Sequence, residues 1–407
     1  MDITQARWLS SPEGYALLRE LGPYDESAAP ALSARLRAAG LGAGFVAALL
    51  TQQRLRTRAR EKFGNFAEGM LFTGDGLEQA TRFEVAAGHA HRFAQASLAT
   101  VHDLGCGIGS DAMALSAFDV TVAAIDADPV TALFADTNLR PWPDSRARLG
   151  RVEDWAAPPS PARDRVGAWL DPARRTGQTD ARGRPRRVFS LEEIAPSWER
   201  VLAVAAAVPA TGVKLSPSFP HDRIPRGSEA QWVSWSGEVL ECTIWWGPLA
   251  RTTGRTAAVL RPGRAPIEVT EDVATAQVPA IPSLAQVRPW LYEADRALVQ
   301  AGLVGAVTAA TDGRELEPGL GFVTADAAYD LGFARRYAVT AALPFTVKAV
   351  RAWLRARGVT SLTVKKRGVR LDDEALRRQL KVRAGDEGTM LLTRVAGRQC
   401  ALMLEAD

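Results

Sequence analysis

Three glycines that follow an acidic residue have the spacing of a loop that binds a nucleotide-like ligand. The segment VHDLGCGIGSDAMAL begins as an apolar strand, is interrupted at Gly105, Gly107 and Gly109, and continues as a helix from about Ser110. Glycines at such a junction allow a ligand to approach the backbone closely. The pattern is acidic-x-GxGxG, headed by Asp103, and therefore differs from the GxGxxG of dinucleotide-binding loops.

Two further acidic positions follow the next two apolar runs. Asp126 lies 21 residues after Gly105, where a carboxylate can accept hydrogen bonds from both hydroxyl groups of a ribose. In RVEDW, either Glu153 or Asp154 could accept a hydrogen bond from an adenine amino group, with Trp155 packed beside the ring. The spacing predicts a site for a ligand that carries adenine and ribose.

These segments resemble four motifs of the class I methyltransferases that use S-adenosylmethionine (SAM). DLGCGIG is similar to their first motif, AIDADP (with Asp126 and Ala127) to the second, VEDW to the third and LDPARR to the fourth. The resemblance covers about residues 71–262 and implies a Rossmann-like enzyme domain with SAM as its cofactor. A Rossmann-like domain for another nucleotide and an inactive, degenerate domain are the alternatives.

Asp171 and Pro172 in WLDPARR are the candidates for catalysis. They stand at the end of the fourth predicted strand, at the edge that faces the ligand crevice in open α/β sheets. In methyltransferases that act on exocyclic amino groups of nucleobases, this place has an acid or Asn, two prolines and an aromatic residue. Here Ala173 and Arg174 replace the second proline and the aromatic residue.

DPAR also occurs in some RNA uracil-C5 methyltransferases, which need a cysteine nucleophile after the following strand. This chain has Lys214, Leu215, Ser216 and Pro217 there. We therefore expect direct, in-line transfer of the methyl group, with Asp171 orienting the acceptor.

Six residues are further candidates for binding the acceptor. Arg174 and Arg175 open a basic run that extends to position 187 and could grip phosphates, although a solvated loop would have the same composition. His221, in SFPHDRIP, could line the acceptor side. The other three are Phe72, Thr73 and Thr81, which precede the glycine loop in the sequence.

The segment LFTGDGLEQATRFEVAAGHAHRFA resembles the aromatic-rich turn and Thr-capped helix that precede the first motif of trimethylguanosine synthase-like methyltransferases. That resemblance implies that Phe72, Thr73 and Thr81 lie near the cofactor or the acceptor. Thr81, with Glu84 three residues later, has the pattern of a capping box and predicts a helix that continues to about Ala96.

Short apolar runs separated by helical stretches predict a doubly wound α/β domain with a parallel sheet. Two later runs, 239–246 and 256–260, are expected to pair antiparallel at one edge of this sheet. The predicted parallel strands are 100–104, 121–125, 147–151, 166–170 and 212–215.

The C-terminal part of the sequence predicts a small α+β module that begins at about Phe333. It resembles the THUMP-like domain found behind methyltransferase domains in bacterial proteins, and TVKAVRAWLRARGVTSLTVKKRGVRLDDEALRRQL is its most recognisable part. THUMP domains bind RNA, so the resemblance implies an RNA partner. The charge agrees, because Thr346 to Arg383 contains twelve Lys or Arg and three acids, whereas the whole chain has a net charge of +4.

The length of 407 residues and 47% hydrophobic content predict two or three domains. We divide the chain into a helical region (1–70), a SAM-dependent methyltransferase domain (71–263), a connecting region (264–332) with a helix expected over 292–301, and a THUMP-like domain (333–407). Three scattered cysteines predict neither disulfides nor a metal site. No signal sequence or membrane-spanning run is recognised, so we expect a cytoplasmic protein without a membrane partner.

The sequence thus predicts a SAM-dependent methyltransferase that modifies a nucleobase nitrogen in structured RNA, either tRNA or rRNA. Two alternatives remain, a small-molecule methyltransferase and a non-catalytic RNA-binding protein that retains SAM.

Overall fold

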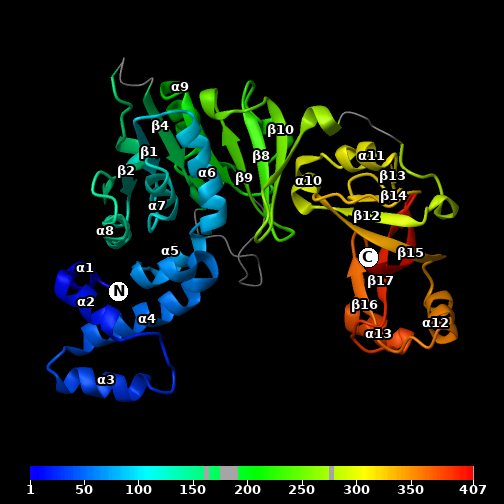
Figure 1. The fold of residues 1–407 in the computed structure, drawn as a ribbon, viewed down its shortest axis with the longest axis horizontal. Helices are drawn as coiled ribbons and strands as arrows, with labels where there is room; N and C mark the ends of the chain where they lie inside the picture. The colour runs from blue at the N-terminus through cyan, green and yellow to red at the C-terminus, as the bar shows by residue number, and fades with distance from the viewer. Residues whose placement is uncertain (160–164, 175–190, 275–278, 407) are drawn as a thin grey trace. The chain divides into compact units, whose positions relative to one another are not determined.

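The structure, a computed structural model, describes residues 1–159, 165–174, 191–274 and 279–406, which form two compact units (Figure 1). The first unit comprises Met1–Phe219, Pro225–Glu229 and Thr243–Thr253. The second comprises Pro220–Ile224, Ala230–Cys242 and Gly254–Asp407.

The first unit begins with helices. A capping box between Asp2 and Gln5 starts the first helix, and Gly64, with φ of 54°, ends the fourth. The apolar faces of these helices share a core with Phe134, which lies on helix α8 of the following α/β region. The helices are α1 (Ile3–Ser10), α2 (Pro12–Glu20), α3 (Ala29–Ala38), α4 (Ala43–Phe63), α5 (Gly74–Gln79) and α6 (Phe83–Gln95).

A parallel sheet follows and confirms the predicted doubly wound arrangement. Its strands lie in the order β7-β4-β1-β2-β3, and β1 pairs with β2 on one side and with β4 on the other. The connecting helices are α7 (Ser110–Ala117), α8 (Pro129–Asn138) and α9 (Trp198–Ala207). The strands are β1 (Thr100–Leu104), β2 (Thr121–Asp126), β3 (Arg146–Leu149), β4 (Val166–Leu170) and β7 (Ala210–Leu215).

The later antiparallel strands differ from the prediction. The runs 239–246 and 256–260 do not pair with each other, because β8 lies between β9 and β10 in the strand order. Strand β10 instead pairs antiparallel with β11. The residues of β8 are buried almost without interruption, so the alternation that marks a half-exposed strand is missing. The strands are β8 (Glu229–Trp235), β9 (Glu238–Trp245), β10 (Gly254–Leu260) and β11 (Ile267–Thr270).

The region 264–332 contains ordered elements instead of a simple connection. The helix expected over 292–301 is wrong in its first part, because β12 ends at Ala294 and Asp295 caps a helix that starts only at Arg296. Strands β12 and β14 pair antiparallel, and β12 also pairs with β15 of the C-terminal part. The elements are β12 (Trp290–Ala294), α10 (Arg296–Ala301), α11 (Gly305–Thr311), β13 (Arg314–Glu315) and β14 (Phe322–Ala325).

A seven-stranded sheet in the order β13-β14-β12-β15-β18-β17-β16 organises the second unit. Alternate residues of β17 face opposite sides: Met390 and Leu392 pack with the helices α12 and α13, whereas Leu391 packs with Leu291 and Phe322. The C-terminal elements are β15 (Ala334–Pro344), α12 (Val347–Ala356), β16 (Thr363–Lys366), α13 (Asp373–Leu380), β17 (Thr389–Val395) and β18 (Arg398–Ala406), which confirm that this part is built from both strands and helices.

Candidate active site

The glycine loop connects β1 to α7 as predicted. Gly105, Gly107 and Gly109 all have positive φ values, of 93°, 55° and 85°, which an L side chain rarely adopts. The backbone N–H groups of Gly105 and Cys106 donate to the carbonyl of Ile125 at 2.9 and 3.0 Å, which ties the loop to the end of β2. A Cβ on Gly107 would meet no atom within 4 Å, so the space beside the loop is open to a ligand.

Asp103 lies at the end of β1 and is 1% exposed. Neither of its carboxylate oxygens has a hydrogen-bond partner among the described residues. Burial raises the pKa of this carboxyl well above its usual value, and the charges of Asp111, Asp171 and Asp126 raise it further. A buried acid without a donor suits a ligand that brings positive charge to the loop.

Asp126 ends β2 beside the glycine loop. Its Oδ2 atom accepts a hydrogen bond from the Gly107 amide at 3.0 Å, and its Oδ1 atom accepts one from the Asp128 amide at 2.9 Å. Burial raises the pKa of Asp126, although these two amide hydrogen bonds act in the opposite direction. The carboxylate and Ala127, which follows it, thus lie where the spacing predicts a ribose-binding group.

The turn after β3 carries the adenine candidates. Glu153 forms an ion pair with Arg151 at 3.5 Å, and both side chains are largely exposed. Asp154 is also exposed and has no ion-pair partner within the described part of the chain. The Trp155 indole donates to Nδ1 of His102 at 3.4 Å and packs edge-on against that ring. Both acids are accessible to an adenine amino group.

A connected chain of polar side chains starts at Asp171, at the end of β4. The Lys214 Nζ lies 2.5 Å from Asp171 Oδ2 and donates to Thr81 Oγ1 at 2.9 Å. Thr81 donates to Asp111 Oδ2 at 2.8 Å, and His89 Nδ1 lies 2.8 Å from Asp111 Oδ1. The Asp171 side chain is 30% exposed and that of Lys214 is 14% exposed, so the network runs from the surface into the interior.

The inner end of this network is a buried pair of Asp111 and His89, whose side chains are 7% and 5% exposed. Burial opposes ionisation of Asp111, but the hydrogen bond and charge of His89, with Lys214 and Thr81, outweigh it and lower the pKa of Asp111. The His89 ring lies 4.4 Å from the Trp169 ring, which stacks on Trp245 at 5.4 Å. The orientation of Lys214 is therefore fixed from within.

The sequence did not reveal the partners in this network. Thr81 is not the N-cap of α6, because the helix starts at Phe83 with Arg82 as its cap and the Thr81 hydroxyl is used in the network instead. Lys214 was noted only as the replacement for a cysteine, and Asp111 was not considered. The only signal for Lys214 was a single charged residue at the carboxyl end of an apolar strand, in GVKLS.

Two other acceptor-side candidates lie in the segment at the start of α5. Phe72 is fully buried, its ring lies 5.8 Å from that of Phe63, and its amide and carbonyl are both hydrogen-bonded to the Gln52 side chain. Thr73 caps α5 by accepting a hydrogen bond from Gly76. Asn138 links the carbonyls of Leu71 and Ile108 and thereby connects this segment to the glycine loop, a role that the sequence did not indicate.

The remaining candidates lie elsewhere or outside the described residues. Pro172 directly follows Asp171, and the backbone of Arg174 pairs with Ile194 in a two-stranded sheet formed by β5 (Ala173–Arg174) and β6 (Ile194–Ala195). Arg175 and the rest of the basic run, up to position 187, lie outside the described residues. His221 belongs to the second unit, where its Nε2 lies 2.7 Å from the Gln300 carbonyl.

Comparisons with known proteins agree with this architecture. Residues 334–406 match the family described as THUMP domain-like, and residues 2–59 match a domain of unknown function, DUF8688. An uncharacterized S-adenosylmethionine-dependent methyltransferase from two strains of Mycobacterium tuberculosis is 29% identical over 356 residues, which cover 84% of this chain and 90% of the relative. A crystal structure of a putative methyltransferase from Porphyromonas gingivalis W83 covers 95% of this chain and 100% of its own, with a TM-score of 0.69 and 19% identity.

The strand order, the glycine loop and the likeness to the solved structure define the fold of class I methyltransferases. The chain is a SAM-dependent methyltransferase with a C-terminal THUMP-like domain.

The described residues contain neither a candidate metal site nor a membrane-spanning helix. No group of three or more His, Cys, Asp or Glu side chains there could hold a metal ion. None of the helices in that part of the chain is long and apolar enough to cross a membrane.

Proposed function

We propose that this enzyme transfers the methyl group of SAM to a nucleobase nitrogen of structured RNA, either tRNA or rRNA. The observation that carries the proposal is the position of the Asp171 carboxylate, which is paired with Lys214. Asp171 follows the end of β4, and the neighbouring strand β1 leads into the glycine loop.

The residues around the glycine loop fit SAM. Bound SAM supplies a methyl group on a positively charged sulfur, which is already a good leaving group. Asp103 would offer its unpartnered carboxylate to the cationic end of the cofactor, and Asp126 would accept hydrogen bonds from the ribose hydroxyls. Either Glu153 or Asp154 would accept from the adenine amino group, with Trp155 beside the ring.

The acceptor end needs positioning more than it needs a strong base. Lys214 compensates the charge of Asp171 and holds its carboxylate in one orientation. Asp171 would then accept a hydrogen bond from an N–H of the base and aim the nitrogen lone pair at the methyl carbon. The nitrogen–carbon bond would form as the sulfur–carbon bond of SAM breaks, with S-adenosylhomocysteine as the leaving group, and Asp171 would take the proton released from nitrogen and pass it to water.

RNA is favoured as the substrate by the THUMP-like segment. Lys348, Arg351 and Arg355 on α12 have no acidic partner among the described residues, and Lys348 and Arg355 are exposed. Unpaired cations on one helix attract a polyanion and make its binding depend on salt. A small neutral acceptor would need none of them.

The test is transfer of labelled methyl from SAM to total RNA from a strain that lacks the gene, with parental RNA as the control. Label that enters only the deletion-strain RNA supports the proposal and allows the modified base to be mapped. Absence of label in both RNA samples, with SAM binding intact, would contradict it and favour a small-molecule acceptor.

The Asp171→Ala variant separates an enzyme from an RNA-binding protein that merely retains SAM. We expect loss of methyl transfer with unchanged RNA binding. Asp144→Asn is a matched control, because Asp144 is an exposed acid of the same unit that lies outside the polar network. If the wild-type protein binds RNA but never methylates it, the proposal that this protein is an RNA methyltransferase is wrong.

A further inference from the structure

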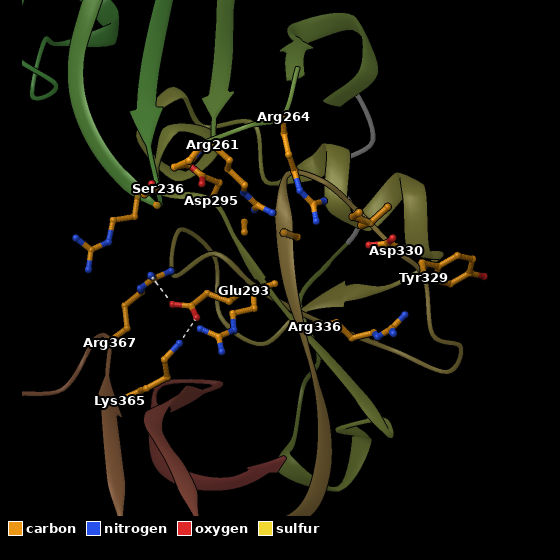
Figure 2. Close-up of a pocket in the computed structure, with 17 residues that line it drawn as sticks. Ser236, Arg261, Arg264, Glu293, Asp295, Tyr329, Asp330, Arg336, Lys365 and Arg367 are labelled. Atoms are coloured by element: carbon orange, nitrogen blue, oxygen red, sulfur yellow. Dashed lines mark hydrogen bonds and ion pairs between the residues drawn. The ribbon is translucent and has the colours of Figure 1, made fainter. Parts of the chain in front are cut away.

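The second unit contains a cavity of about 690 Å³ that the SAM site does not use. Its walls come from segments far apart in the sequence: the β10–β11 connection, the β12–α10 junction, the start of β15, and β16 with the residue that follows it. Figure 2 shows Arg261 and Arg264 extending into it from one side and Lys365 and Arg367 from the other.

The lining is strongly basic. It contains seven basic and three acidic side chains; the basic ones are Arg261, Arg264, Arg296, Arg335, Arg336, Lys365 and Arg367. The acids are largely engaged: Glu293 pairs with both Lys365 and Arg367, and accepts from the Tyr337 hydroxyl at 3.0 Å. Asp295 caps α10 through the amide of Ala297. Only Asp330 among the acids is exposed.

Three of the basic side chains have no acidic partner among the described residues. The side chains of Arg261, Arg264 and Arg296 form no hydrogen bond or ion pair with any described residue. Burial lowers the pKa of Arg367, Glu293 counteracts this, and the nearby charge of Arg296 lowers it further. Guanidinium groups this crowded repel one another, and a bound anion would relieve the repulsion.

We propose that this cavity binds phosphate groups of an unpaired RNA strand. This RNA contact is separate from Lys348, Arg351 and Arg355 on α12. Planar guanidinium groups match phosphate oxygens in pairs, and a cavity of this size is in the usual range of about 300–1,000 Å³ for ligand pockets. Tyr329, which is 39% exposed on the lining, offers a ring on which a base stacks. The inference rests on the proposed function, because it names a contact of the same substrate.

The test uses the full chain and a labelled single-stranded RNA of about ten nucleotides, a length that spans a typical single-strand site. Affinity is measured over a series of salt concentrations for the wild type and for Arg261→Ala/Arg264→Ala. We expect the variant to bind about tenfold or more weakly and to lose roughly 1.4 from the slope of log affinity against log salt, because each phosphate contact contributes about 0.7.

Arg35→Ala/Arg37→Ala is the matched control, since it removes two exposed arginines from α3 in the first unit. Arg261→Lys/Arg264→Lys keeps the charge but loses the paired geometry, and is expected to fall between the wild type and the alanine variant. SAM affinity, measured for every variant, reports whether the first unit is intact.

Unchanged RNA affinity and salt slope in the alanine variant would overturn the inference, while methyl transfer by the wild type would leave the proposed function standing. Conversely, an RNA affinity that depends on Arg261 and Arg264 without any methyl transfer to RNA would support the cavity and remove the proposed function. Arginine-dependent binding of a free nucleoside triphosphate, with no binding of the RNA, would show that the assignment to RNA is wrong.

Discussion

The carboxyl group of Asp103 is buried beside the glycine loop without a donor from the described residues. Its raised pKa means that the folded protein keeps a proton that the unfolded chain has already released. Between the usual carboxyl pKa and this raised value, stability therefore falls as pH rises. In the same range, a cationic ligand favours the ionised form, so SAM should bind more tightly as pH rises.

Asp103→Asn should separate the two effects. We expect the variant to be more stable than the wild type at neutral pH by at least about 1 kcal/mol, because the amide is buried without a charge and without uptake of a proton, and each unit of pKa shift corresponds to about 1.4 kcal/mol. SAM affinity should fall and lose its dependence on pH. Thermal melts and calorimetric titrations from pH 5 to about 8 check both, and equal stability with unchanged SAM affinity would contradict the role given to Asp103.

Lys214 is predicted to act by positioning Asp171. Lys214→Met should reduce the rate of methyl transfer by about 10²-fold, as misplacement of reacting groups does, and change SAM affinity little. Lys214→Arg should restore part of the rate. Single-turnover kinetics, with SAM binding measured alongside, test this, and a rate like that of the wild type for Lys214→Met would exclude the positioning role.

At this scale the sequence predicted the residues around the glycine loop but not the polar network. Gly105 and Asp126 could be predicted because their spacing along the chain is characteristic of such a site. The contact between Thr81 and Lys214 joins residues 133 positions apart, and a threonine before a helix has a common local alternative as a cap. Only the folded structure shows that the Thr81 hydroxyl joins the polar network and does not cap the helix.

Among the elements, β7 depends on a glycine that faces large rings. A Cβ on Gly212 would lie 2.5 Å from the Trp245 ring and 2.9 Å from the Trp169 ring, and both indoles are 1% exposed. The absence of a side chain at this position lets the two rings stack across the sheet, and His89 packs on Trp169. The strand therefore couples the core to the polar network.

Gly212→Ala should destabilise the protein by about 1–3 kcal/mol, as overpacking of a dense core does. It should also slow methyl transfer, because movement of Trp169 displaces His89 and with it Asp111. Gly88→Ala on α6 is the control, since a Cβ there meets nothing within 4 Å. Denaturant unfolding of both variants tests the expectation, which fails if the two are equally stable.

The element predictions succeeded where chain periodicity was clear and failed where it was not. The strands at 100–104 and 166–170 have the predicted bounds. By contrast, β12 was predicted as helix, because LYEADRALVQA reads as one helical pattern and only the cap at Asp295 divides it. Strand β8 escaped prediction because nearly every residue of it is buried.

On the scale of the whole molecule, the THUMP-like match begins in the middle of a sheet. Strand β15 pairs with β12 along one edge and with β18 along the other. Ile281, Leu291 and Phe322, which precede the matched residues, share one core with Leu402. The C-terminal residues alone therefore lack one side of their core.

A fragment of residues 334–407 should not melt cooperatively, whereas a fragment of residues 281–407 should, because the longer one retains β12, β13 and β14. Circular dichroism during heating compares them directly. Cooperative melting of the shorter fragment at the same temperature would show that the upstream strands are dispensable.

The path of the chain between the two units also limits how such a protein can evolve. The boundaries of the two units mean that the backbone passes from one to the other five times, and β9 contributes its first part to the second unit and its last part to the first. No single cut in the gene would release a complete unit, and a fusion that carried only residues 281–407 would leave the earlier segments of the second unit behind. The two halves are expected to be inherited, lost and duplicated together.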